Sequence, residues 1–501
     1  MSLDPVSLQV LVGALRSACE EMGAVLIRSA HSANIKERRD CSTALFDAAG
    51  ELVMQAEHIP VHLGSMPDAV AAVLGAAHRP GEHWILNDPY RGGTHLPDIT
   101  VITPVLAQGG RLLGFAASRA HHADVGGPTP GGMPSASSTL EQEGVVIPPT
   151  RATEETLREL AESMRNPRQR LADLRAQRAA NLTGERRLLE LAERMGADGM
   201  AAGLDEILAY AERRARAALG DLPDGVYAAT DVLEAPDGHD IKLRVAARVR
   251  GDALELDFAG TDDQVEGNLN CPLAVTKSAA HFAVKVVCDP DGPPSAGAFR
   301  PVSVTAPSGC LLNARSPAAV AAGNVETSSR VADLVLAALG EAVAVPAQGQ
   351  GTMNNLTLAG EEWTYYETIA GGQGACPDAP GPSAVHVAMS NTLNTPVEAL
   401  EDEYPLRVRE LSLRRGSGGA GRHGGGDGVV REIEALEPAR FTLITERRRH
   451  APMGREGGGD GAPGRNFLNG EELPGKTSGE LRPGDRLRIE TPGGGGYGAM
   501  P

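Results

Sequence analysis

Glycine is unevenly distributed along this chain, and that distribution constrains the fold more than any other feature. The chain has 501 residues and 61 glycines, and from Gly416 onward the glycines gather in short runs such as 424–426 and 493–496. The runs are separated by short strand patterns. Because apolar runs persist between the glycines, we expect a β-rich module in which the glycines form tight turns, rather than a flexible linker.

The N-terminal part has a different pattern, typical of long helices. From Pro5 to about Ala30, apolar residues recur at steps near three, four and seven, as one buried face of a helix requires. Residues 153–219 are rich in Ala, Leu, Glu and Arg, which predicts a long helical stretch whose charges form a solvated face. A shorter helix is expected over residues 67–77.

Strand patterns lie between and after these helices. Apolar runs flank the turn-forming residues Asp47 to Gly50, which indicates a β-hairpin over residues 44–54. The other expected elements are strands at 83–86, 99–106, 112–118, 243–249 and 253–258, and helices at 274–287 and 325–339.

These patterns predict an α+β, mixed multi-domain fold. The predicted division is an N-terminal α/β module with long helices over residues 1–220, a mixed α/β module over 221–410, and a glycine-rich β module over 411–501.

Composition argues against several classes of function. Acidic residues outnumber basic ones by 65 to 47 and aromatic residues make up 3% of the chain, so a nucleic-acid groove lined by basic and stacking side chains is not expected. No run approaches the ~20 apolar residues needed to span a bilayer. Residues 1–10 lack the features of a signal peptide, so we expect a cytoplasmic protein. The six cysteines include no CxxC pair, which argues against a zinc ribbon, an iron–sulfur cluster or a disulfide framework.

Two polar clusters carry the candidate chemistry of the N-terminal module. Each follows an apolar run and contains a His-x-x-Asp motif, formed by His95 with Asp98 and by His121 with Asp124. Two adjacent strand ends, each with one imidazole and one carboxylate, would supply four ligands of the kind that Zn²⁺, Mn²⁺ or Fe²⁺ prefers. Asp40 is a candidate further ligand. The alternative is that these residues only cap strands, bind backbone amides or, for Asp40, pair with neighbouring arginines.

The same segments resemble the hallmark blocks of the hydantoinase B/oxoprolinase family. That family includes B subunits of N-methylhydantoinases, the C-terminal half of 5-oxoprolinases, lactamase relatives and acetone carboxylase subunits. Segments similar to further family blocks occur in the same order along nearly the whole chain. They are residues 4–6, 37–42, 62–66, 323–328, 353–355, 366–372, 394–398 and 491–498.

The resemblance implies a division of labour between two subunits. A separate A subunit, an ATPase with an actin-like fold, would bind ATP and activate the amide oxygen of a small cyclic amide, while this chain, as the B subunit, would open the ring. The expected assembly is a hetero-oligomer, which could contain a dimer of this chain.

The family's metal positions map onto Asp40, His95, Asp98, His121 and Asp124. His122 stands where many relatives carry an aromatic residue, so both His121 and His122 are candidate ligands. His121 is favoured because it alone keeps the three-residue spacing to Asp124.

The expected mechanism uses a metal ion that lowers the pKa of bound water from ~15.7 toward ~7 and polarises the carbonyl. Asp40 would bind the metal or act as general base, and His62 would bind substrate or shuttle protons. Arg119 or Arg91 would stabilise developing negative charge. Residues 470–477 match the P-loop pattern, but the sequence after them does not favour the helix that a phosphate-binding loop requires, so we expect ATP on the partner instead.

Two other functions are weighed against this one. The chain could belong to an ATP-dependent ligase like acetone carboxylase, although those large subunits are longer than this chain. It could also be a scaffold without turnover, against which the complete set of carboxylates and imidazoles argues. The substrate ring, whether hydantoin, 5-oxoproline or another lactam, stays open.

Overall fold

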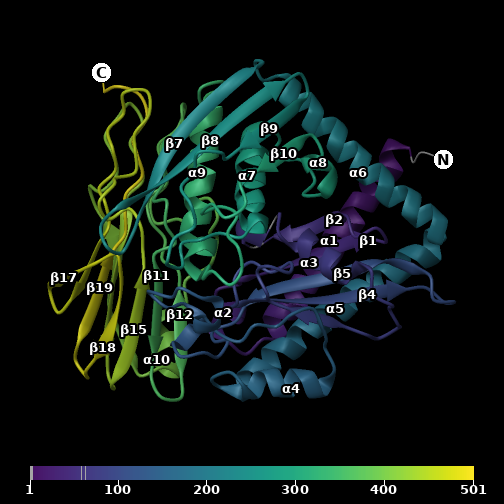
Figure 1. The fold of residues 1–501 in the computed structure, drawn as a ribbon, viewed down its shortest axis with the longest axis horizontal. Coiled ribbons are helices and arrows are strands. Elements are labelled where there is room, and N and C mark those ends of the chain that lie inside the picture. Colours follow the sequence, from purple (N-terminus) through teal and green to yellow (C-terminus); the bar gives the residue numbers. More distant parts are fainter. Residues whose placement is uncertain (1–3, 58, 63, 501) are drawn as a thin grey trace.

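The computed structural model describes residues 4–57, 59–62 and 64–500. Within these residues the strands form four β-sheets, accompanied by long helices, which confirms the α+β expectation. In Figure 1 the first sheet lies at the lower right, the second at the top, and the two C-terminal sheets at the left. No helix in the described part of the chain is long and apolar enough to cross a membrane.

The first sheet is antiparallel, with the strand order β2-β1-β5-β4-β3-β6. Its two faces are covered by different helices. Leu45 packs with helix α1 (Pro5–Ser29), whereas its neighbour Phe46 points to the opposite face and packs with helix α3 (Met66–Leu74). The strands are β1 (Cys41–Asp47), β2 (Leu52–Glu57), β3 (Trp84–Leu86), β4 (Asp98–Leu106), β5 (Leu112–His121) and β6 (Thr150–Arg151). The structure confirms the predicted hairpin over residues 44–54 and the predicted helices over residues 5–30 and 67–77. It also confirms the predicted strands at 83–86, 99–106 and 112–118.

The predicted helical stretch over residues 153–219 consists of three helices, α4 (Glu154–Glu162), α5 (Pro167–Met195) and α6 (Ala197–Gly220). Asn166 has a left-handed backbone (φ 54°) and Pro167 starts α5, while Gly196 (φ 73°) separates α5 from α6. Gln177 of α5 is buried against the first sheet and donates a hydrogen bond to the backbone oxygen of Ile99. The buried face of α5 thus combines polar residues such as Gln177 with apolar ones such as Ala180. Shorter helices are α2 (Ala33–Lys36), η1 (Pro60–His62), η2 (Pro130–Gly132) and η3 (Leu140–Gln142).

The second sheet has the order β10-β9-β8-β7 and shares a hydrophobic core with two long helices. Its strands are β7 (Gly225–Glu234), β8 (Asp240–Arg250), β9 (Ala253–Asp257) and β10 (Val302–Thr305), and its helices are α7 (Leu273–Cys288), α8 (Ala296–Phe299) and α9 (Ser328–Leu339). The expected strands and helices of this region are confirmed. Helix α9 is preceded by one π-helical turn, η4 (Gly323–Thr327), a feature that is frequent at functional sites.

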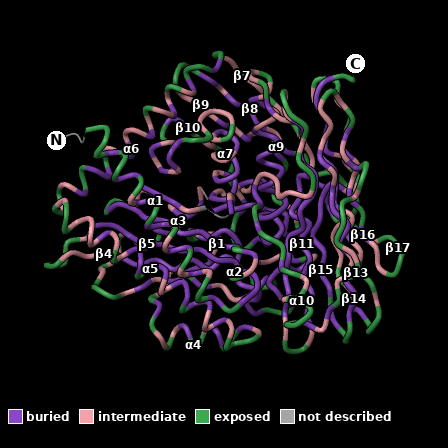
Figure 2. The backbone as a smooth tube through the Cα atoms, turned by 180° about the vertical axis from the view of Figure 1, so that it is seen from behind, coloured by how far each residue is buried: buried purple, intermediate pink, exposed green. Residues whose placement is uncertain are grey.

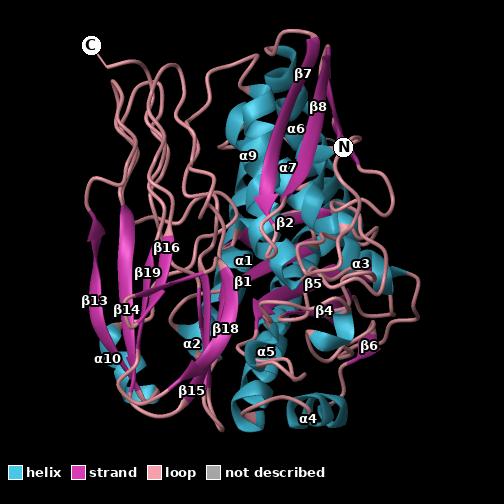
Figure 3. Ribbon diagram, turned by 60° about the vertical axis from the view of Figure 1, so that its left-hand side comes forward, coloured by secondary structure: helices cyan, strands magenta, loops and turns pink. Residues whose placement is uncertain are grey.

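The third and fourth sheets pack face to face around a common core at the C-terminal side (Figure 3). The third has the order β12-β11-β15-β18 and the fourth β13-β14-β19-β16-β17. The strands are β11 (Asn355–Ala359), β12 (Thr364–Glu367), β13 (Leu406–Arg414), β14 (Gly428–Ala435), β15 (Ala439–Ile444), β16 (Arg465–Leu468), β17 (Glu471–Leu473), β18 (Lys476–Leu481) and β19 (Arg486–Glu490), with helix α10 (Val397–Glu403). The third sheet takes strands from both sides of residue 410, and the predicted boundaries at 220 and 410 stay predictions.

Most of the glycine runs are not tight turns, which corrects the sequence-based expectation. They lie in extended segments that run side by side beyond the ends of the C-terminal strands and bond to one another through their backbones (Figure 3). Gly494 donates to the oxygen of Gly426 at 2.9 Å, and a Cβ on Gly425 would lie 2.0 Å from the oxygen of Gly494. Glycine is required here because no side chain fits between the segments, rather than because of a positive φ.

The P-loop-like segment 470–477 contains no phosphate-binding helix. Its Lys476 begins strand β18 and bonds to the buried carboxylate of Glu446. The prediction that no helix follows the motif is confirmed.

Candidate metal centre

The candidate metal centre lies at one end of two neighbouring inner strands of the first sheet, β4 and β5. β4 begins at Asp98, β5 ends at His121, and the two residues face each other in the antiparallel register. His95 lies in the loop before β4. That loop is tightly packed, because a Cβ on Gly93 would lie 2.2 Å from the oxygen of Asn87. The predicted meeting of two strand ends is confirmed.

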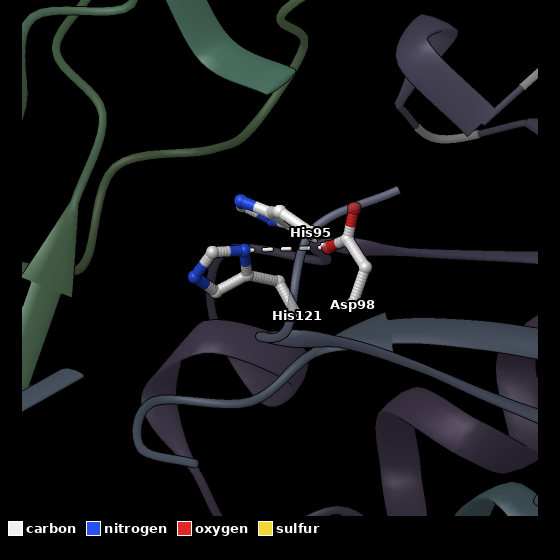
Figure 4. A group of neighbouring side chains, drawn as sticks. All are labelled: His95, Asp98 and His121. Atoms are coloured by element: carbon white, nitrogen blue, oxygen red, sulfur yellow. Dashed lines mark ion pairs between the residues drawn. The ribbon is translucent and has the colours of Figure 1, made fainter. Parts of the chain in front are cut away.

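Three side chains converge at this point, as Figure 4 shows. Nε2 of His95 lies 3.2 Å and Nδ1 of His121 lies 3.4 Å from the same carboxylate oxygen, Oδ1 of Asp98. One potential ligand atom from each of the three residues lies within 4.8 Å of those of the other two. All three side chains are buried, and Figure 2 shows that the surrounding strands are buried as well. A small, closed cluster of two nitrogens and one oxygen results.

The second oxygen of Asp98 is held by neighbours from three other parts of the chain. Thr94 donates its hydroxyl to Oδ2 at 2.8 Å, and Asn324 of the π-helical turn donates its amide at 3.2 Å. Nε2 of His62 lies 3.5 Å away, while its Nδ1 is 2.9 Å from the hydroxyl of Ser42. Oδ1 is thereby left to face the histidines.

The charge states of these groups suit metal binding. Burial by itself raises the pKa of Asp98, but the charges of His95 and His62 and hydrogen bonds from His121 and His62 hold it well below its usual value. Burial lowers the pKa of His121 to about 4 and also lowers that of His62. Near neutral pH the carboxylate is therefore ionised and these two imidazoles are neutral, the forms that bind metals.

Several buried nitrogen and oxygen atoms at the centre lack hydrogen-bond partners in the described part of the chain, which fits the binding of a divalent ion. Nε2 of His95 and Oδ1 of Asn324 are buried, and neither has a hydrogen-bond partner among the described residues. The same holds for Nε2 of His121, the ring nitrogen that does not face Asp98. Buried polar atoms without partners are rare and call for an explanation. Imidazole nitrogens with one carboxylate form the mixed set that Zn²⁺, Mn²⁺ and Fe²⁺ accept.

Asp124 is not brought into this group. Its Oδ1 accepts hydrogen bonds from the backbone of Gly126 and Arg165, and its Oδ2 accepts from the backbone of Gly131 and from the Arg165 guanidinium at 3.1 Å. The carboxylate thus holds together the loop that follows β5. Asp124 as a metal ligand stays a prediction that these contacts do not support.

Asp40 and His122 flank the centre in different ways. The backbone oxygen of Asp40 accepts from the amide of His121, and burial together with the charge of Asp98 raises the pKa of the Asp40 carboxyl to about 7. His122 follows His121 and points to the opposite side, where its Nε2 lies 3.0 Å from the Gln177 side chain of α5. His121, as favoured from the sequence, is the one of the pair that reaches the group.

The two predicted arginines differ in placement. Arg119 is fully buried, and each of its three nitrogens donates to a neutral acceptor, namely the hydroxyls of Thr100 and Ser65 and the backbone oxygen of Gly92. Arg91 is exposed. The predicted role of Arg119 or Arg91 in stabilising negative charge stays a prediction.

Sequence reasoning missed three residues of this region, two of which come from distant segments. Asn324 bonds to Asp98, Tyr366 stacks on His121 with ring centroids 4.5 Å apart, and the guanidinium of Arg38 lies 5.9 Å from the centre of the Tyr366 ring. All three lie in segments that resemble family blocks, which was the available signal.

Residues 4–500 match the sequence profile of the hydantoinase B/oxoprolinase family. The chain belongs to this family. A putative D-/L-hydantoinase B subunit from Pseudomonas sp. (strain NS671) is 30% identical over 99% of this chain and 90% of its own length. The 5-oxoprolinase of Dictyostelium discoideum is 40% identical over 99% of this chain, which spans only 40% of that longer protein.

Two solved structures have a similar fold. The ATP-dependent caprolactamase of Pseudomonas jessenii superposes with a TM-score of 0.93 at 30% identity, covering 100% of this chain and 92% of that one. An ATP-dependent acetone carboxylase chain shares the fold alone, with a TM-score of 0.87 at 18% identity over 99% of this chain and 76% of the other.

Proposed function

We propose that this chain is the B subunit of an ATP-dependent cyclic amide hydrolase that opens the ring with the help of a divalent metal ion. The observation that carries the proposal is the buried His95, Asp98 and His121 group. It occurs in a chain that a hydantoinase B subunit and an ATP-dependent caprolactamase match over nearly their whole lengths. The metal, when bound, would polarise the amide carbonyl and acidify a water molecule.

The chain's own residues would divide the remaining work. His95, Asp98 and His121 would hold the ion, while Thr94 and Asn324 fix the orientation of the Asp98 carboxylate. Asp40 would accept the proton of the attacking water, since a pKa near 7 suits a general base at neutral pH. His62 would bind substrate or pass protons between the centre and Ser42.

A partner would supply the ATPase. Residues 470–477 provide no nucleotide loop, and the Pseudomonas relative is named as a B subunit. The chain also spans only 40% of the Dictyostelium 5-oxoprolinase. We therefore place ATP and the activation of the amide oxygen on a hydantoinase A-like subunit, in a cytoplasmic hetero-oligomer.

The test is to co-purify the chain with its A-type partner and to measure ATP hydrolysis coupled to ring opening for hydantoins, 5-oxoproline and other lactams. Coupled ring opening with one divalent ion per copy of this chain is expected. Turnover that consumes bicarbonate and a ketone instead would favour the carboxylase alternative. Coupled ring opening by protein stripped of divalent metal would contradict the role of the metal.

A further inference from the structure

Arg38 is a fully buried cation close to the candidate metal centre that lacks a counter-ion. Five arginines are among the largest side chains that the fold buries completely: Arg38, Arg119, Arg170, Arg330 and Arg447. The last three each lie within 3.5 Å of a carboxylate, and Arg119 donates from all three of its nitrogens. Neither Arg38 nor Arg119 forms an ion pair with any residue in the described ranges, but only Arg38 of these two also leaves guanidinium nitrogens without an acceptor, which makes it the exception.

The hydrogen bonds of Arg38 are incomplete as well. Its Nη2 donates to the hydroxyls of Thr368 at 2.7 Å and Thr392 at 3.1 Å, and lies 3.5 Å from the backbone oxygen of Thr368. Nε and Nη1 are buried and meet no acceptor in the described part of the chain. Three N–H groups of a guanidinium are therefore left unsatisfied inside the protein. Such an arrangement is costly unless a further partner binds there.

The backbone holds Arg38 on the side of the metal centre. The next residue, Arg39, has a left-handed backbone (φ 56°) and is exposed, whereas Arg38 and Asp40 on either side of it are both buried. Strained residues of this kind cluster at functional sites. The guanidinium lies 5.9 Å from the centre of the Tyr366 ring, and that ring stacks on His121.

We propose that Arg38 is an oxyanion-binding residue of this site, which takes an anionic oxygen of the substrate or product through its free N–H groups. The source of the anion rests on the proposed function, whereas the anion-binding role of Arg38 does not. One source is a phosphoryl group placed on the amide oxygen by ATP. The other is a carboxylate, present on some cyclic amides and formed on ring opening. A guanidinium recognises both through charge-assisted hydrogen bonds.

A purely structural reading is that Arg38 only offsets the negative charges of Asp40 and Asp98. In that case any cation at position 38 would serve, and no anion would bind. The free N–H groups together with the missing ion pair point to the binding role instead: Arg170 also leaves Nε and Nη1 without an acceptor among the described residues, but it pairs with the carboxylate of Asp173.

The experiment is to titrate the full chain, freed of metal by a chelator, with inorganic phosphate and separately with acetate. Calorimetry at constant ionic strength reports the affinity. The variants are Arg38→Met, Arg38→Lys and, as a matched control, Arg39→Met, which removes the adjacent but exposed guanidinium. Thermal unfolding checks that each variant is folded, and if Arg38→Met does not fold, Arg38→Lys decides the outcome.

Saturable binding of at least one anion is expected for the wild type and for Arg39→Met. Arg38→Met should lose that binding and Arg38→Lys should weaken it about tenfold or more, since a lysine cannot reproduce the planar donor set. Binding of phosphate alone assigns the site to a phosphoryl group, and binding of acetate alone assigns it to a carboxylate. No saturable binding to the wild type, or unchanged affinity in Arg38→Met or Arg38→Lys, would overturn the proposal. Because the titration involves no ATP, partner or turnover, its result is independent of whether the ring-opening assay succeeds.

Discussion

The hydroxyl of Thr94 offers a sharp test of how the candidate centre is built. It donates to Oδ2 of Asp98 at 2.8 Å, the shortest of three contacts to that oxygen, ahead of Asn324 at 3.2 Å and His62 at 3.5 Å. A hydrogen bond to a charged group is worth about 1.5–3 kcal/mol. At about 1.4 kcal/mol for each factor of ten, Thr94→Val should weaken metal binding roughly 10- to 100-fold.

Because other contacts to Oδ2 of Asp98 remain, we expect the loss of metal affinity to fall in the lower half of that range. Asn324 remains in the Thr94→Val variant and still orients the carboxylate, so the single change should cost about tenfold, and the double change Thr94→Val with Asn324→Ala should cost more. The assay is a competition titration of Zn²⁺ or Mn²⁺ against a chromophoric chelator.

Thr103→Val is the matched control for this experiment. Thr103 is a buried threonine on β4, the strand that begins at Asp98, and its hydroxyl bonds to His83 instead of to the centre. This variant can lose stability but should keep its metal affinity. Equal metal affinity in the wild type and Thr94→Val, or an equal loss in both threonine variants, would refute the reasoning.

Two further predictions concern stability. Gly425→Ala should destabilise the C-terminal part by several kcal/mol, because its Cβ would meet the Gly494 oxygen at 2.0 Å, whereas Gly13→Ala in the exposed part of α1 should stabilise by about 0.5–1 kcal/mol; chemical unfolding measures both, and equal effects would contradict the backbone packing. Burial, with the nearby charge of Glu446, raises the pKa of Glu326 to about 7. Its proton is thus bound more tightly in the folded than in the unfolded chain, and the stability this contributes is complete below about pH 4.5 and lost as the pH rises through 7. Unfolding at pH 5 and pH 8 should show a smaller loss in Glu326→Gln than in the wild type, and an identical pH dependence would contradict this account.

The sequence allowed most helices and strands to be predicted because their patterns are local. The apolar period of residues 5–30 and the hairpin around Gly50 depend only on neighbouring residues. The glycine runs were misread because a turn and a close contact between backbones both require glycine. Only the pairing of distant segments, such as Gly426 with Gly494, distinguishes the two.

The same reason explains what was found and missed at the candidate centre. His95, Asp98 and His121 belong to two short motifs whose strands are neighbours in the sheet, so their meeting could be predicted. Asp124 shares the motif, but the loop after β5 turns its carboxylate toward Arg165. Asn324 and Tyr366 come from segments more than 200 residues after His121 in the chain, so no local pattern links them to it. Arg38 lies two residues before Asp40, and only the resemblance of its segment to a family block marked it.

The metal content of three purified variants tests the central claim most directly. His95→Ala and His121→Ala should lose most of the divalent metal that the wild-type chain binds, measured by elemental analysis after loading with Zn²⁺ or Mn²⁺. His122→Ala, which removes the adjacent imidazole on the side of α5, should keep it. Full metal occupancy in both His95→Ala and His121→Ala would contradict the assignment of this centre.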